Sequence, residues 1–111
     1  MKKPTRWYSN KQEKQVAKAI KGKQTANSGA TAFQKGDVFT ADWLIECKTS
    51  TSLKKSFSIQ KEWLEKNKEE AFGMGKLYSA LAFNFGPDTN NYYIIDEKTF
   101  NTIINLMEVE Q

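Results

Sequence analysis

The chain has 111 residues, of which 39% are apolar and 27% charged, which suits one domain over residues 1–111 with a small hydrophobic core. With no histidine and a single cysteine, Cys47, it offers no internal disulfide and almost no basis for a histidine-based triad or a structural zinc site. A bound metal is therefore expected to be a hard cation held by oxygen. No transmembrane helix or signal peptide is expected, and the lone cysteine fits a reducing cytoplasm.

The net charge of +4 is unevenly distributed along the chain. Residues 1–36 carry nine basic residues and one acid, Glu13, giving +8, whereas residues 37–111 carry eight basic and twelve acidic residues, giving −4. A basic segment attracts polyanions, of which nucleic acid is the commonest, although a solvated lysine-rich surface is an equal alternative for this feature alone. The candidate phosphate contacts in this segment are Lys11, Lys14, Lys21, Lys23 and Lys35.

A first helix is predicted from about residue 9 to residue 21. The segment Ser9-Asn10-Lys11-Gln12 has the pattern of a capping box with Ser9 as N-cap, and Gly22 follows the last helical residue. Tyr8 is interpreted as a hydrophobic staple before this N-cap in preference to a base-stacking residue. Glu13 falls on or beside the inward face, which consists of Val16, Ala17 and Ile20.

Strand patterns dominate the middle of the chain. Residues 37–40 and 43–48 are strong strand candidates, and a less defined strand interrupted by a loop is expected within residues 23–36. A loop rich in serine and threonine follows, over residues 49–58. In this loop, Lys54 and Lys55 are candidate phosphate contacts or, equally, solvated side chains.

The residue pattern in the second half of the chain predicts two more helices and two more strands. A helix is expected over about residues 58–72, with an apolar stripe formed by Ile59, Trp63, Leu64 and Ala71. Strands are expected over residues 77–85 and 92–95, separated by a turn at residues 86–88. A last helix has a stripe formed by Phe100, Ile103, Ile104 and Met107. The order αβββαββα predicts an α/β domain with a mixed sheet.

Asp37 and Glu46 are predicted to face each other across the central hairpin. If Ala41 and Asp42 form a two-residue tip, Asp37 and Glu46 have Cβ atoms about 4.5–5.5 Å apart on one side of the sheet. Lys48, two residues further on, points to the same side. Facing carboxylates repel, whereas a divalent cation between them makes the arrangement favourable. We therefore predict a Mg²⁺ site that acidifies bound water, with Lys48 orienting that water or offsetting phosphate charge.

Each of these residues has an ordinary structural explanation when it is considered alone. Asp37 follows a glycine and suits a turn, Glu13 suits a helix surface, and Glu46 with Lys48 suits a surface salt bridge worth about 0–1 kcal/mol. The combination is more specific, because buried acids need a compensating partner. Burial of this strand is indicated by its apolar residues Leu44, Ile45 and Cys47.

The segments Gly36-Asp37 and Glu46-Cys47-Lys48, with Glu13 on a preceding helix, resemble the PD-(D/E)xK nuclease superfamily. More narrowly, the chain is similar to the archaeal-type Holliday junction resolvases and their phage-encoded relatives over about residues 8–96. The supporting segments include Ser28-Gly29-Ala30 and the helix–glycine–strand order that follows the hairpin. This resemblance implies a restriction-endonuclease-like mixed β-sheet flanked by helices, and a homodimer that cuts branched DNA with Mg²⁺ or Mn²⁺.

By matched position, the resemblance implies that Asp37 and Glu46 bind metal, that Lys48 assists the water, and that Glu13 is the helix acid, which could complete the ligand set. Ser28 stands where the resolvases carry a serine near the active site. This sequence departs from the family's pattern at two places. Gly36 replaces the superfamily's proline. The arginines often seen before the Ser-Gly segment are absent, and Lys21 and Lys23 lie there instead. The second departure bears on junction selectivity. Gln60 is interpreted as a polar residue beside a helix cap rather than as an active-site glutamine.

The expected function is a structure-selective endonuclease that resolves four-way junctions by paired nicks during DNA recombination. It would act in the cytoplasm, or in the host cytoplasm if phage-encoded, without a membrane partner. Two alternatives stay open: a nicking or duplex-cutting endonuclease of the same superfamily, and a non-catalytic basic nucleic-acid-binding domain. The expected partners are branched or double-stranded DNA and a second copy of the chain, which would bind through the last helix or the region of Tyr92 and Tyr93.

Overall fold

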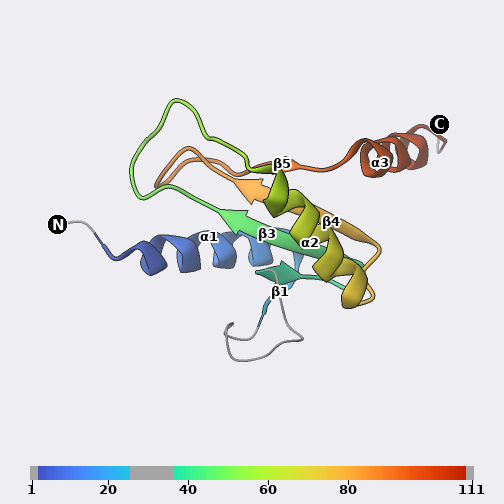
Figure 1. Cartoon of the computed structure of the whole chain (residues 1–111), viewed down its shortest axis with the longest axis horizontal. Helices are drawn as coiled ribbons and strands as arrows, with labels where there is room; N and C mark the ends of the chain where they lie inside the picture. Colours follow the sequence, from blue (N-terminus) through green and yellow to red (C-terminus); the bar gives the residue numbers. More distant parts are fainter. Residues whose placement is uncertain (1–2, 26–36, 110–111) are drawn as a thin grey trace.

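Five strands form one sheet in the order β1-β2-β3-β4-β5, with helices on both faces (Figure 1). The structure is a computed structural model and describes residues 3–25 and 37–109. Its elements are α1 (Thr5–Ile20), β1 (Lys23–Gln24), β2 (Val38–Phe39), β3 (Trp43–Lys48), α2 (Lys61–Gly73), β4 (Tyr78–Phe83), β5 (Tyr92–Ile94) and α3 (Glu97–Val109). Strands β3 and β4 are parallel and the other pairs antiparallel. The predicted element order and the mixed sheet are therefore confirmed.

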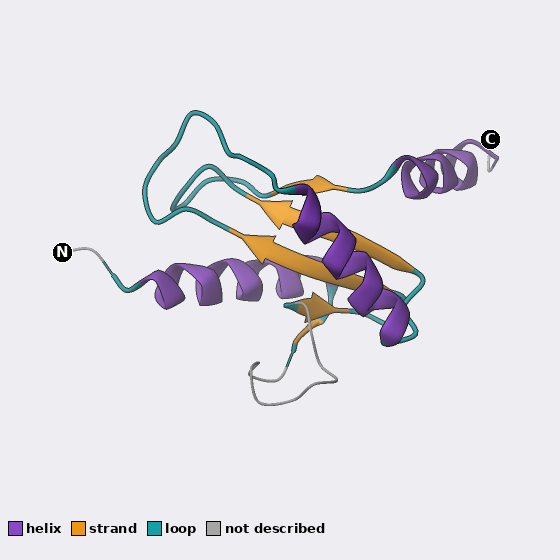
Figure 2. Cartoon of the chain, in the orientation of Figure 1, coloured by secondary structure: helices purple, strands orange, loops and turns teal. Residues whose placement is uncertain are grey.

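The central strands β3 and β4 lie between α1 and α2, as Figure 2 shows. Val16 of α1 is fully buried against a cluster that includes Val38, Ile45, Ala80 and Ala82. Helix α2 connects β3 to β4 and covers the other face, because two parallel neighbours need a crossover connection. Side chains alternate along β3, so Ile45 faces α1 while Glu46 and Lys48 face the side of α2. No helix within the described residues is long and apolar enough to span a bilayer.

The β2–β3 hairpin has the predicted register. Val38 pairs with Ile45 and Phe39 with Leu44, which places Ala41 and Asp42 at the tip. An Ala-Asp tip is not a favoured two-residue turn by sequence. The Nζ of Lys76 donates to the carbonyls of Thr40 and Ala41 at 2.6 and 3.2 Å, and these bonds stabilise the tip from outside the hairpin.

Helix α1 begins at Thr5, a turn earlier than predicted, and the capping-box prediction is wrong. Pro4 is the N-cap residue, in an extended conformation, and its carbonyl accepts the amide of Trp7 at 3.0 Å. A proline has its φ already fixed near the value needed for helix entry. Ser9 therefore lies inside the helix, where its hydroxyl donates to the Thr5 carbonyl at 3.4 Å. Tyr8 also lies inside the helix, where its ring packs edge-on against that of Trp7, so it is not a staple before the N-cap.

Helix α2 begins at Lys61, later than the expected start near Ser58. The segment before the helix packs against the sheet, with the Phe57 and Phe83 ring centroids 5.3 Å apart, and Gln60 at its end is extended. Gln60 is the exposed N-cap residue, and its carbonyl accepts the Trp63 amide at 3.0 Å. This position agrees with its interpretation as a polar residue beside the cap.

Gly86 holds the loop after β3 against the end of β4. Its φ is +127°, and an added Cβ would lie 2.6 Å from the Ser52 carbonyl oxygen. The amide of Lys54 also donates to the Phe85 carbonyl at 2.8 Å, so the two loops meet at this point. A side chain cannot be placed there without moving the backbone.

We expect Gly86→Ala to lower the free energy of unfolding by about 3 kcal/mol, because it combines an unfavourable φ with overpacking. Gly73→Ala is the matched control, since a Cβ at Gly73 meets nothing within 4 Å. Urea unfolding of the two variants measures the difference. Equal stability of both variants would contradict the close packing of the loops at Gly86.

Candidate metal centre

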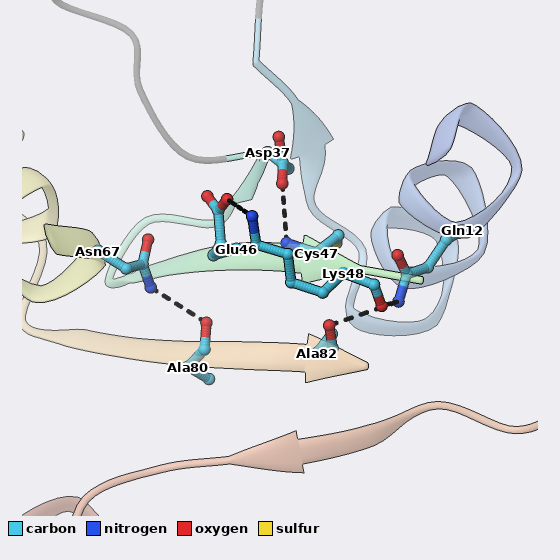
Figure 3. Close-up of polar contacts among 8 residues, drawn as sticks. All are labelled: Gln12, Asp37, Glu46, Cys47, Lys48, Asn67, Ala80 and Ala82. Atoms are coloured by element: carbon cyan, nitrogen blue, oxygen red, sulfur yellow. Dashed lines mark hydrogen bonds and ion pairs between the residues drawn. The ribbon is translucent and has the colours of Figure 1, made fainter. Parts of the chain in front are cut away.

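Asp37, Glu46 and Lys48 lie together beside β3, as Figure 3 shows. The amide of Cys47 donates to Asp37 Oδ2 at 2.8 Å, which fixes the Asp37 carboxylate at the edge of the strand that carries Glu46. Lys48 Nζ is 3.6 Å from Glu46 Oε2 on the same side of the strand. The hairpin register therefore brings the three predicted residues into one site.

Both carboxylates of this site are poorly hydrated. Burial raises the pKa of Asp37 above its ordinary value, and the Cys47 amide, Lys48 and Arg6 only partly oppose this effect. The pKa of Glu46 is raised to about 7, first by burial and then by the charge of Asp37. Lys48 lowers the Glu46 pKa, whereas Glu70 on α2 raises it further. Both shifts mean that negative charge is unfavourable on this pair as it stands, and a bound cation would stabilise the ionised carboxylates.

Lys48 is held from two sides. Its ammonium group lies near Glu46 and also 4.4 Å from the centroid of the Trp63 ring. A cation over an aromatic face is attracted by the ring's electrons. Trp63 was expected only in the apolar stripe of the second helix. Its contact with Lys48 forms because α2 packs on β3. This packing cannot be read from the local sequence.

Glu13 interacts electrostatically with Asp37, but it is not grouped with Asp37 and Glu46 as a third ligand. It is on α1, and its Oε1 accepts a hydrogen bond from Gln24 of β1 at 3.3 Å. Burial raises the Glu13 pKa, and the charge of Asp37 raises it further. Across residues 3–25 and 37–109, no three His, Cys, Asp or Glu side chains are grouped closely enough to hold a metal. The role of Glu13 as a ligand stays a prediction.

The donor set nevertheless fits Mg²⁺. This ion commonly uses one or two protein carboxylates, keeps several waters and completes its coordination with phosphate oxygens. Asp37 and Glu46 supply two carboxylates whose raised pKa values indicate an uncompensated negative site. A full cage of protein ligands is not required for this ion.

Gln12 links α1 to the ends of both central strands, and sequence analysis missed it. Its side chain is buried, and Nε2 donates to the carbonyl of Lys48 at 2.8 Å and to that of Ala82 at 3.4 Å. The same nitrogen donates to Asn91 Oδ1 at 3.1 Å. Gln12 therefore fixes the end of β3, which carries the site. The signal was present, because Gln12 occupies an apolar position one turn before Val16.

Asn67 has a similar place on the opposite face. It is buried on α2, and its Nδ2 donates to the Ala80 carbonyl at 3.1 Å (Figure 3). It follows Trp63 by four residues and precedes Ala71 by four, so it lies in the middle of an apolar stripe. A buried amide at such a position can satisfy strand carbonyls that an apolar side chain would leave unpaired.

We expect Gln12→Leu to reduce the free energy of unfolding by about 2 kcal/mol, because strand carbonyls would lose a buried donor. Gln15→Leu changes an exposed glutamine of the same helix and should stay within about 0.5 kcal/mol of the wild type. Thermal and urea unfolding measure both. An unchanged stability of the Gln12 variant would rule out its role in fixing β3.

The predicted phosphate-contacting lysines have different environments. Lys11 is engaged by Asp88 at 2.7 Å and lies 5.1 Å from the centroid of the Trp7 ring. The exposed ones are Lys14, Lys21, Lys23, Lys54 and Lys55. Ser28 and Lys35 lie outside the described residues. Arg6, which sequence analysis did not single out, exerts a favourable electrostatic effect on Glu13 and Asp37.

No protein-family model, curated protein or solved structure matches this chain. Its function must therefore be inferred from the chemistry of its own residues.

Proposed function

We propose that this chain is a divalent-cation-dependent DNA endonuclease of the PD-(D/E)xK type that resolves four-way junctions. The observation that carries the proposal is the desolvated carboxylate pair of Asp37, directly before β2, and Glu46 on β3, beside Lys48. Such a pair is unfavourable by itself, and a hard cation compensates it. Nucleases of this superfamily combine the same residue types in the same order along the chain.

The residues have distinct parts in this proposal. Asp37 and Glu46 would hold Mg²⁺ or Mn²⁺, which when bound supplies a polarised phosphate and a more acidic water. Lys48 would orient that water or offset charge on the phosphate oxygens. Trp63 restrains the Lys48 ammonium, and Gln12 fixes the strand end that carries it. The hydrogen bond from the Cys47 amide keeps the Asp37 carboxylate beside Glu46.

The basic first helix supports DNA as the substrate. Its described residues include Lys14 and Lys18, both exposed, and Glu13 is its only acid. Such a surface attracts the phosphate backbone and makes binding sensitive to salt. Paired nicks on a junction need two active sites at a fixed spacing, which a two-fold dimer supplies. The proposal therefore includes a homodimer.

A cleavage assay with two labelled substrates tests the proposal. The full chain is incubated with a four-way junction and with a duplex of the same sequence, each with Mg²⁺ or with a chelator. We expect symmetric nicks on the junction that require Mg²⁺. Cutting of both substrates would instead select an endonuclease without junction preference. Salt-sensitive binding without cutting in Mg²⁺ or Mn²⁺ would overturn the enzyme and select a non-catalytic binding domain.

A further inference from the structure

Lys48 has a longer ion pair and a closer ring contact than other lysines of the chain. Its Nζ lies 3.6 Å from Glu46 Oε2, whereas the exposed ion pairs that lysines of α1 and α2 make with Asp88 and Asp96 are 2.7 and 2.9 Å long. The same Nζ is 4.4 Å from the centroid of the Trp63 ring, and contacts of other lysines with aromatic rings are 5.0 to 5.7 Å long. The ammonium group is therefore displaced from the carboxylate toward the ring.

The packing of α2 on the sheet fixes the position of the Trp63 ring. Trp63 is in the first turn of the helix, and its amide donates to the Gln60 carbonyl at 3.0 Å. One turn later, the buried Asn67 donates to the Ala80 carbonyl of β4 at 3.1 Å. The backbone that carries the ring is thus attached to the sheet, whereas Lys48 has a long and flexible side chain. The ring can therefore determine where the ammonium group lies.

An ammonium group and a divalent cation compete for the same carboxylate. If Lys48 approached Glu46 to the roughly 2.7–2.9 Å of a close charged pair, it would occupy a carboxylate oxygen and place a like charge beside the cation. Contact with an aromatic face attracts the ammonium group without using a carboxylate oxygen. The side chains of Lys48 and Glu46 are only 30% and 23% exposed, so salt and water screen these charges less than at the surface.

We propose that Trp63 is a positioning residue that keeps the Lys48 ammonium group off the Glu46 carboxylate, so that the carboxylate oxygens stay available to a divalent cation. The Lys48 ammonium group remains beside the site and does not block it. This inference rests on the cation site of the proposed function, but it requires neither DNA nor cleavage.

Proton NMR of the metal-free protein tests which residue positions Lys48. Protons above an aromatic ring are shifted upfield, so the ε-methylene protons of Lys48, identified by their loss in Lys48→Met, should lie upfield of those of exposed lysines. This shift should persist in Glu46→Gln, remain in part in Trp63→Phe and disappear in Trp63→Leu. Loss of the shift in Glu46→Gln, or its persistence in Trp63→Leu, would overturn the proposal.

Calorimetric titration with Mg²⁺, without DNA, tests the consequence for the cation. We expect Trp63→Leu to weaken Mg²⁺ binding about three- to tenfold and Trp63→Phe to keep most of the affinity, because phenylalanine retains an aromatic face. Trp7→Leu is the matched control, since the Trp7 ring makes the same kind of contact with Lys11 of α1, at 5.1 Å. Its Mg²⁺ affinity should equal that of the wild type.

A double-mutant cycle shows whether Trp63 acts through Lys48. In a Lys48→Met background, Trp63→Leu should have no further effect on Mg²⁺ affinity, because the ammonium group on which the ring acts is absent. Circular dichroism checks that each variant is folded. An equal loss of affinity in both backgrounds, or no loss in either, would overturn the inference about Trp63 alone. A wild type that does not bind Mg²⁺ would overturn the proposed nuclease as well.

Discussion

Asp37→Asn and Glu46→Gln are each expected to lower the Mg²⁺-dependent cleavage rate by at least ~10³-fold while DNA binding persists. Each change removes one of the two carboxylates that would hold the cation, and a bound metal contributes several kcal/mol to stabilising transition-state charge. The substitutions keep the side-chain shape, and the amide oxygen that Asp37→Asn introduces can still accept a hydrogen bond from the Cys47 amide. Initial rates on a labelled junction and binding in a chelator measure the two effects separately.

Matched controls distinguish loss of the site from loss of a charge. Asp42→Asn changes an exposed aspartate at the tip of the same hairpin, and Glu69→Gln changes an exposed glutamate on α2. Both controls should cleave at nearly the wild-type rate. Full cleavage by Asp37→Asn or Glu46→Gln would show that the reaction does not use this pair. Parallel losses of binding and cleavage would indicate instead that the variant had lost its fold.

Glu46→Gln is also expected to stabilise the metal-free protein above pH 7, by up to about 3 kcal/mol. The pKa of Glu46 is raised to about 7 in the folded chain, against an ordinary value of 4.5. Between these values the folded state binds more protons than the unfolded state, so stability falls as pH rises through this window. A glutamine cannot ionise, so Glu46→Gln should not show the loss of stability that the ionisation of Glu46 causes. Urea unfolding from pH 4 to 8 in a chelator measures it.

Two further measurements make this expectation specific to a cation site. The pKa values of Asp37 and Glu13 are also raised in the folded chain. The free energy of unfolding of Glu46→Gln should therefore still fall as pH rises, but less steeply than that of the wild type. Added Mg²⁺ should raise the wild-type melting temperature at pH 8, because an ion that binds only the folded state stabilises it. Glu46→Gln should reduce this shift. A pH profile shared by wild type and variant, with equal Mg²⁺ shifts, would contradict a desolvated Glu46 at a metal site.

Local sequence was sufficient for the order of helices and strands and for the pairing of β2 with β3. The alternation of Leu44, Glu46 and Lys48 defined which side chains share a face, since the period of a strand is two residues. That pairing placed Asp37 beside Glu46 without any knowledge of the remaining chain. The end of α1 was also well placed, but its start was not, because Pro4 provides the helix entry that the sequence pattern assigned to Ser9.

The tertiary structure decided the contacts between elements that are distant along the chain. Gln12 reaches the ends of β3 and β4, and Trp63 reaches Lys48, only because α1 and α2 pack on opposite faces of the sheet. That same arrangement leaves Glu13 on the α1 side as a neighbour of Asp37, whereas Glu46 faces α2. The tertiary structure also leaves Phe100, Ile104 and Met107 of α3 exposed, although their spacing predicted a buried stripe. Periodicity can show that a helix has an apolar face, but only the packing of the chain shows whether anything covers it.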